Sequence, residues 1–90
     1  MVENEILAIH DMDNVGVVLA DVYKGEKLII AGTESTAKED IKFGFKIALK
    51  DMKKGEHIVK YGCNIGIASR DILKGEMVHI HNIDGLLGNE

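Results

Sequence analysis

The sequence contains no proline and no tryptophan, and its 90 residues include one cysteine, two phenylalanines and two tyrosines. The single cysteine, Cys63, excludes an internal disulfide and suits a reducing compartment, and we expect it to be a buried structural thiol. With so few aromatic residues, the core must be built from Ile, Val, Leu and Met. We expect one small domain over residues 1–90, with a core from 6 to 83 and a tail from 84 to 90.

The chain also lacks a basic block and a long apolar run. Its net charge is −4, and charges of both signs are interleaved, which argues against a nucleic-acid surface. No apolar run approaches the ~20 residues needed to cross a bilayer, and the acidic start lacks a signal-peptide pattern. We therefore expect a cytoplasmic protein that binds neither nucleic acid nor membrane. Because a chain this short buries only about 60–65% of its unfolded surface, a partner subunit or a homo-oligomer would stabilise it.

One short phrase occurs three times: Asp-Val-Tyr-Lys-Gly-Glu at 21–26, Asp-Met-Lys-Lys-Gly-Glu at 51–56 and Asp-Ile-Leu-Lys-Gly-Glu at 71–76. Its glycine suits a left-handed position just past a helical turn, and the preceding lysine suits the negative end of the helix dipole. We predict a short helical turn that feeds a strand in each copy. The copies are 30 and then 20 residues apart, which argues against a stacked solenoid and favours a mainly β domain.

Four strands are expected. The strand 6–10 precedes the first turn, and the strands 26–31, 56–60 and 76–83 follow the repeated turns. Asp13 or Asn14 is expected to cap a helical turn through 15–23, the polar segment 32–40 to form a loop or hairpin tip, and 61–66 to form a tight connection.

Two histidines stand at alternate positions of the last expected strand. A period of two places Met77, His79 and His81 on one face, opposite Val78, Ile80 and Asn82. Two imidazoles on one face can share a metal or an anionic substrate, or move a proton near neutral pH. Two surface histidines on an edge strand fit the pattern as well.

A second group of polar residues ends the first expected strand. His10, Asp13 and Asn14 fall where a strand meets a loop, which is where ligands usually meet a rigid scaffold. A hydrogen-bonded histidine and two capping residues would give the same pattern. His57 is expected at the surface.

Two lysines flank glycine-containing connections. Lys46 follows Gly44 and Phe45, and Lys60 precedes Tyr61 and Gly62. Cations beside glycines can hold a substrate carboxylate, since the small residue lets a ligand approach the backbone. Solvated strand-end lysines are the alternative.

Four motifs in order suggest a family. They are His-Asp-Met-Asp-Asn-Val at 10–15, Phe-Gly-Phe-Lys-Ile-Ala-Leu at 43–49, Lys-Tyr-Gly-Cys-Asn-Ile-Gly at 60–66 and Val-His-Ile-His-Asn at 78–82. The chain resembles the amino-terminal SAF-type domain of the altronate/galactarate dehydratase family, which includes the free-standing small subunit of sulfolactate sulfo-lyase. The resemblance covers about 6 to 83 and implies a β-clip fold with short helical turns.

The same resemblance implies a role in eliminating water, or sulfite in relatives, from a sugar acid or related hydroxy acid. The residues that match the family's characteristic positions are His10, Asp13, Asn14, Lys46, Lys60, Tyr61, Gly62, His79, His81 and Asn82. We expect catalytic or metal-binding roles for His10, His79 and His81, and substrate binding by the others. A larger dehydratase subunit is expected to carry most catalytic groups and to hold a divalent metal such as iron or manganese.

The chain departs from the family pattern at one position, since Phe45 stands where the family usually has histidine. Two other functions therefore stay open. SAF-type domains also resemble carbohydrate-contacting modules, so the chain is compatible with a binding or assembly module without catalytic residues. A structural remnant that no longer serves an enzyme is the third interpretation.

Overall fold

The computed structural model describes residues 6–7, 12–79 and 81–84, and within them the chain is made of short antiparallel strands. These strands are β1 (Ile6–Leu7), β2 (Val15–Val18), β3 (Lys27–Ile30), β4 (Thr33–Thr36), β5 (Lys46–Ala48), β6 (His57–Lys60), β7 (Cys63–Ala68), β8 (Met77–Val78) and β9 (Ile83–Asp84). No described residue is helical. The mainly β prediction is confirmed, and the predicted helical turns are wrong.

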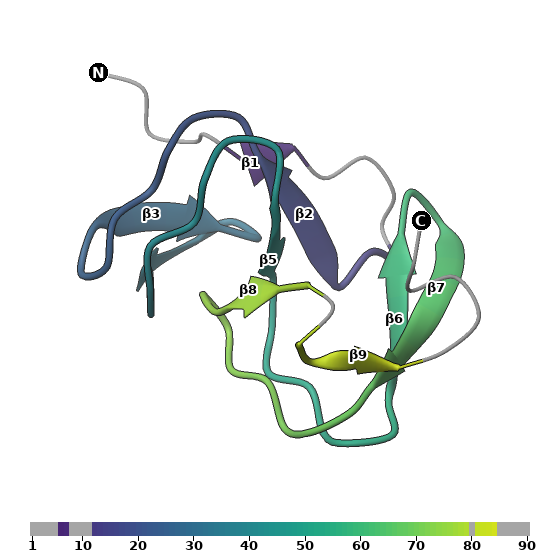
Figure 1. Cartoon of the computed structure of the whole chain (residues 1–90). Helices are drawn as coiled ribbons and strands as arrows, with labels where there is room; N and C mark the ends of the chain where they lie inside the picture. Colours follow the sequence, from purple (N-terminus) through teal and green to yellow (C-terminus); the bar gives the residue numbers. More distant parts are fainter. Residues whose placement is uncertain (1–5, 8–11, 80, 85–90) are drawn as a thin grey trace.

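The strands form three antiparallel sheets (Figure 1). A central sheet has the order β1-β2-β5-β8, a hairpin is formed by β3 and β4, and a third sheet has the order β6-β7-β9. In the central sheet Val17 pairs with Lys46, and Lys46 pairs with Val78 on its other side. Strands that lie 29 and 32 residues apart in the sequence (17 to 46 and 46 to 78) are therefore neighbours.

The repeated phrase forms paired turns in place of helices. The turn at 21–26 lies against the segment 40–45. The repeated phrase does not reveal this segment, because the segment keeps the aspartate, the apolar second residue and the glycine but lacks the Lys before the glycine and the Glu after it. Asp21 Oδ1 accepts the backbone N–H of Phe43 at 2.9 Å, and Asp40 Oδ1 accepts that of Lys24 at 2.8 Å. This exchange of hydrogen bonds fixes the turns because each carboxylate satisfies an amide of the opposite segment.

The turns at 51–56 and 71–76 pair in the same manner. Asp51 Oδ1 accepts the N–H of Lys74 at 2.9 Å, and Asp71 Oδ1 accepts that of Lys54 at 2.8 Å. In all three copies of the phrase the glutamate Oε1 accepts the N–H of the residue three positions earlier, at 3.0 Å: Glu26 from Tyr23, Glu56 from Lys53 and Glu76 from Leu73. The predicted left-handed glycines are confirmed, with φ of 90°, 91° and 93° at positions 25, 55 and 75.

The molecule is thus an internal duplication of one unit. Each unit holds a turn, a hairpin and a second turn, and bridges join Val22 to Ile41 in the first unit and Met52 to Ile72 in the second. The offset is thirty residues before the hairpin (22 to 52) and thirty-one after it (41 to 72). The extra residue follows from a bulge in the second hairpin, where the register shifts between Ile58 and Val59.

Two core clusters fill the two units. The first is Ile6, Val18, Val22, Leu28, Ile30, Ala37, Ile41, Ile47 and Leu49, and the second is Val15, Ala48, Met52, Ile58, Ala68, Ile72, Val78 and Ile83. The central sheet lies between them, because alternate residues of β5 face opposite sides: Ile47 enters the first cluster and Ala48 the second. As expected from the composition, no aromatic side chain belongs to either cluster.

The last expected strand is wrong in its extent. β8 ends at Val78 and β9 begins at Ile83, and the described residues between them form a turn. The segment 32–40, expected as a loop or hairpin tip, instead contains β4. The segment 61–66 turns at 61–62 and then enters β7, and 15–18 is strand β2.

Candidate functional site

The turn between β8 and β9 carries His79 and His81, the two histidines of the last motif. Asn82 is buried, and its Oδ1 accepts the N–H of His79 at 2.9 Å while its Nδ2 donates to the carbonyl of Met77 at 2.9 Å. The N–H of Asn82 donates in turn to the carbonyl of His79 at 3.0 Å. These bonds close the turn, so the histidines do not alternate along a strand. His79 is half-buried and His81 is exposed.

His79 packs against the residue that departs from the family pattern. The rings of Phe45 and His79 lie with centroids 4.9 Å apart and planes inclined by 56°. Phe45 is 36% exposed and precedes β5, so the contact joins the edge of β5 to the turn after β8. A tilted aromatic contact of this kind restrains the imidazole without using either ring nitrogen.

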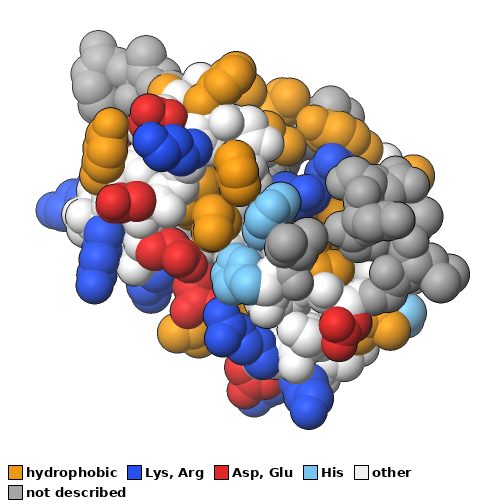
Figure 2. All heavy atoms as spheres, viewed as in Figure 1, with side chains coloured by type: hydrophobic (Ala, Val, Ile, Leu, Met, Phe, Trp, Pro, Cys, Tyr) orange, Lys and Arg blue, Asp and Glu red, His pale blue; other side chains and the backbone are white. Residues whose placement is uncertain are grey.

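Figure 2 shows pale-blue histidine side chains near the middle of one face, with lysine or arginine side chains close to them. His10 lies outside the described residues, so the expected grouping of His10 with His79 and His81 stays a prediction. Among the residues that the structure describes, no three His, Cys, Asp or Glu side chains are placed to hold a metal ion.

Lys46 is a perturbed charged group of the described chain. Lys46 on β5 is half-buried, and this burial lowers the pKa of its ammonium below the ordinary lysine value; the charge of Lys60 lowers it further. Lys60 ends β6 and stands with its Nζ 5.2 Å from the centre of the Tyr61 ring. The sequence left these lysines as possible solvated strand ends, and the structure places them close enough to repel one another.

Tyr61 and Gly62 form the tip of the β6–β7 hairpin. Both have positive φ, 55° and 77°, as a two-residue turn of the I′ type requires, and the matching positions of the first hairpin do the same. The N–H of Gly62 donates to Asp13 Oδ1 at 2.7 Å. This bond holds the hairpin tip against the segment that precedes β2.

Asn14 supports the same hairpin from inside. It is 4% exposed, and its Nδ2 donates to the carbonyl of His57 at 2.8 Å while its Oδ1 accepts the N–H of Val59 at 2.7 Å. It caps no helix; it fastens the start of β2 to β6. The side-chain nitrogen and oxygen of Asn14 both form hydrogen bonds with backbone groups. The expected contact of Asn14 with substrate stays a prediction.

The sequence reasoning missed two contacts of this region. Phe45 meets His79, and His57 Nδ1 lies 2.9 Å from Asn64 Nδ2. Cys63, expected to be buried, is exposed.

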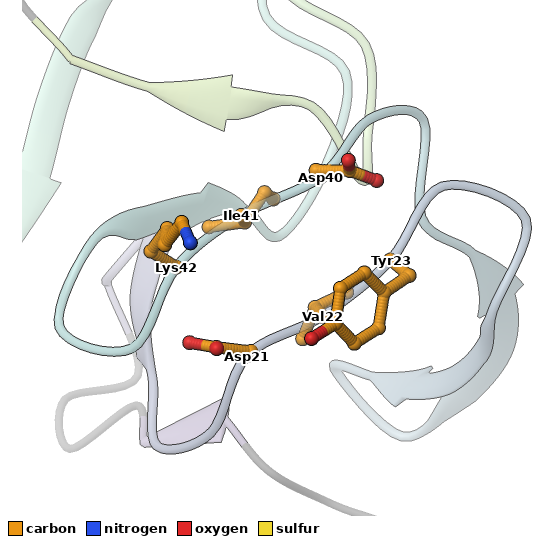
Figure 3. Close-up of a pocket in the computed structure, with 6 residues that line it drawn as sticks. All are labelled: Asp21, Val22, Tyr23, Asp40, Ile41 and Lys42. Atoms are coloured by element: carbon orange, nitrogen blue, oxygen red, sulfur yellow. The ribbon is translucent and has the colours of Figure 1, made fainter.

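Two depressions on the surface are formed by the paired turns. Figure 3 shows the first, where the segments 21–23 and 40–42 run side by side with Val22 and Ile41 at its middle. It holds about 60 Å³, and the second, about 140 Å³, is lined by the equivalent segments 51–53 and 71–73. Both are small beside typical ligand pockets, and they recur because the paired turns recur.

The sequence was compared with known proteins. The family model described as "Altronate/galactarate dehydratase SAF domain" matches residues 4–86. The chain belongs to this family. The mainly β, antiparallel architecture agrees with the β-clip expected of a SAF domain.

The relatives of this SAF domain differ in length. The chain is 50% identical over 76 residues to "Altronate dehydratase" of Bacillus subtilis and 41% identical over 78 residues to that of Escherichia coli. These matches cover 84% and 87% of this chain but only 15% and 16% of the two enzymes. It is also 30% identical to "(2R)-sulfolactate sulfo-lyase subunit alpha" of Chromohalobacter salexigens, over 83% of this chain and 88% of that subunit.

The described part of the SAF domain contains no helix that is long and apolar enough to span a membrane.

Proposed function

We propose that this SAF domain is the small subunit of a cytoplasmic hydro-lyase that acts on a sugar acid or a related hydroxy acid. A larger subunit carries most of the active site, and the small subunit completes or covers it. The observation that carries this proposal is the family match over residues 4–86, with relatives that include altronate dehydratases and a sulfolactate sulfo-lyase subunit alpha. In this proposal the remaining part of the enzyme is a separate chain.

A comparison between the two units of the duplication supports a partner on one face. The second turn of the second unit reads Lys74-Gly75-Glu76, whereas the equivalent turn of the first unit reads Phe43-Gly44-Phe45. Phe43 is 65% exposed. The same backbone turn thus carries charges in one unit and two exposed aromatic rings in the other, and aromatic rings are enriched where proteins meet. We assign the Phe43–Phe45 turn to the boundary with the larger subunit.

The chemistry of the proposed reaction sets what this chain contributes. Elimination beside a carboxylate needs a base for the α-proton, an acid for the leaving group and stabilisation of the charge that develops. Lys46 and Lys60 supply positive charge for the substrate carboxylate. His79, held by Phe45, supplies an imidazole that can move a proton near neutral pH.

A divalent metal such as iron or manganese is part of the proposal only as a group of the larger subunit. The described residues offer no complete ligand set, so this chain alone does not fit such a site. Any ligand from His10, His79 or His81 would add to those of the partner, and a bound metal there would stabilise the developing charge.

The test is reconstitution with a larger subunit of the dehydratase family. The small chain alone should be inactive on altronate and galactarate, and mixing should restore turnover. Phe43→Lys, which copies Lys74, should weaken complex formation by about tenfold, whereas Leu73→Lys, at an exposed residue of the other unit, should leave it unchanged. Turnover by the small chain alone would refute the proposal. Association without any gain in turnover would favour the assembly-module interpretation.

A further inference from the structure

The end of the β3–β4 hairpin lies against β8, the strand that leads into the turn with the two histidines (the histidine turn). The N–H of Lys38, two residues after β4, donates to the carbonyl of Gly75 at 3.0 Å. A Cβ atom at Gly75 would lie 2.6 Å from the carbonyl oxygen of Thr36, so the two backbones are close. Next to Lys38, Glu39 accepts the N–H of Met77 through Oε2 at 2.9 Å. The first unit thus holds the first residue of β8.

The bond from Glu39 reaches a backbone group for which the sheet supplies no partner. β8 is the last strand of the central sheet, and in it Met77 pairs with Ile47. The neighbouring pair, Ala48 with Glu76, carries the hydrogen bond to β5 at 2.9 Å, so the backbone groups of Met77 point away from β5. Met77 is half-buried, and its side chain packs against the first core cluster. A backbone N–H in such a position needs an acceptor, and the Glu39 carboxylate is a strong one.

The carbonyl of Met77 is held by the buried Asn82. Asn82 Nδ2 donates to this carbonyl at 2.9 Å, and Asn82 Oδ1 accepts the N–H of His79 at 2.9 Å. Asn82 is 1% exposed, so water does not replace these bonds. Three hydrogen bonds of 2.9 Å therefore lead from Glu39 to the backbone of His79. A displacement of Met77 would move Asn82, and Asn82 would move the start of the histidine turn.

The second unit indicates that the duplicated fold does not need the Glu39 carboxylate. The backbone bond made just before Glu39 recurs there, since the N–H of Ser69 donates to the carbonyl of Asn82 at 3.0 Å. The offset of thirty-one residues after the hairpin places Arg70 at the position of Glu39 (39 to 70). Arg70 is exposed, and a guanidinium donates hydrogen bonds but accepts none. The acceptor is thus a feature of the unit that contacts β8.

We propose that Glu39 is a positioning residue for His79. By holding Met77 it fixes the start of the histidine turn, and the His79 imidazole keeps its place against Phe45, with 4.9 Å between the ring centroids. Glu39 acts through the backbone and not on reacting atoms. The use of the imidazole in proton transfer rests on the proposed function, whereas the placement of the ring rests on the hydrogen bonds alone.

The experiment compares four variants of the whole chain. Glu39→Arg copies Arg70, which the fold accommodates at the equivalent position. Glu39→Leu removes the acceptor without adding a cation, and Glu39→Gln keeps an oxygen that accepts an N–H. Glu34→Arg is the matched control, because it makes the same change of charge on exposed β4.

The measurements are made by NMR on the free chain and then by kinetics in the complex with a larger subunit. In Glu39→Arg and Glu39→Leu, amide hydrogen exchange at Met77 and His79 should become about tenfold faster, and the NOE between the rings of Phe45 and His79 should weaken. Glu39→Gln and the control should keep the native exchange rates and NOE. In the complex, Glu39→Arg and Glu39→Leu should lower kcat about tenfold with KM unchanged, because a displaced imidazole loses its orientation toward the substrate.

A merely structural role gives a different result. If Glu39→Arg lowers the free energy of unfolding while exchange at His79 and the ring NOE stay native, Glu39 does not position the imidazole. Unfolding of both Glu39→Arg and Glu39→Leu would likewise assign the residue to the fold. Equal changes in Glu39→Gln and Glu39→Leu would overturn the proposal as well, because the acceptor would then not be the cause.

The positioning role and the proposed function fail separately, because the NMR measurements need no larger subunit. Changed exchange and NOE in Glu39→Arg, without turnover in any mixture, would refute the proposed function alone. Restored turnover with the native chain, together with unchanged exchange and NOE in Glu39→Arg, would refute the role of Glu39 alone.

Discussion

Asn14→Ala should lower the free energy of unfolding of the domain, because the Asn14 side chain fastens β2 to β6 through two buried hydrogen bonds. The variant leaves the carbonyl of His57 and the N–H of Val59 without these partners, which lie at 2.8 and 2.7 Å in the native chain. A buried backbone group that loses its partner costs about 1–3 kcal/mol, so the two together predict a loss of about 2–6 kcal/mol. A domain of this size has a total stability of only about 5–10 kcal/mol.

Asn64→Ala is the matched control. Asn64 also makes two side-chain hydrogen bonds, to the ring of His57 and from the N–H of Gly66, but it is exposed. Water replaces those partners, so we expect a loss below about 1 kcal/mol. The two variants therefore separate burial from the number of hydrogen bonds.

The measurement is urea unfolding followed by circular dichroism, with free energies of unfolding extrapolated to water. Asn14→Asp tests the same two hydrogen bonds through the pH dependence of stability. It keeps an acceptor for Val59 but turns a carboxylate oxygen toward the carbonyl of His57, which raises the pKa of the new carboxyl. Its stability should therefore be highest at low pH and fall as the carboxyl ionises. A loss for Asn14→Ala no larger than that for Asn64→Ala would refute the clamp.

Three further predictions concern stability. Because burial lowers the pKa of Lys46, its charge opposes folding at neutral pH. The free energy of unfolding should therefore rise as the pH increases from that lowered pKa to the ordinary lysine value of 10.5. Lys46→Met should abolish this rise in pH-dependent urea titrations. Gly66→Ala should cost more than about 2 kcal/mol, since its Cβ would meet a β9 side chain at 2.6 Å, whereas Gly32→Ala, with φ of 83° and no atom within 4 Å, should cost about 1 kcal/mol by the same measurement. Asp71→Ala should cost about 1 kcal/mol, because the N–H of Lys54 loses its acceptor, and faster hydrogen exchange at Lys54 alone would localise the loss. The first prediction is contradicted if the unfolding free energy of the native chain does not change over this pH range. The second is contradicted by equal stability losses for the two glycine variants, and the third by an unchanged hydrogen-exchange rate at Lys54.

Local patterns predicted the strands that follow each repeated turn. The expected strands 26–31 and 56–60 contain β3 and β6, because a glycine with φ near 90° ends each turn immediately before an apolar run. The helical interpretation failed since the hydrogen bonds of each turn come from another segment. Asp51 and Asp71, for example, satisfy amides more than fifteen residues away, and a sequence window does not contain such partners.

The last motif failed for a related reason. His79 and His81 have the spacing of a strand, yet the buried Asn82 closes a turn around them. The fourth turn at 40–45 was invisible because Phe43 and Phe45 replace the charged residues of the phrase. The order of four motifs nevertheless identified the family, since a resemblance spread over the chain does not depend on the local conformation.

The family, the β class and the places where the chain must turn follow from the order of residues alone, because glycines and short polar side chains act on their nearest neighbours. Which charged side chains meet depends on how the strands pack. Lys46 and Lys60 lie fourteen residues apart (46 to 60), on strands of different sheets, and their mutual repulsion arises from strand pairing and from the side of the core on which each strand projects its residues. Strand pairing joins segments about thirty residues apart, so a short stretch of sequence does not show which of these side chains become neighbours.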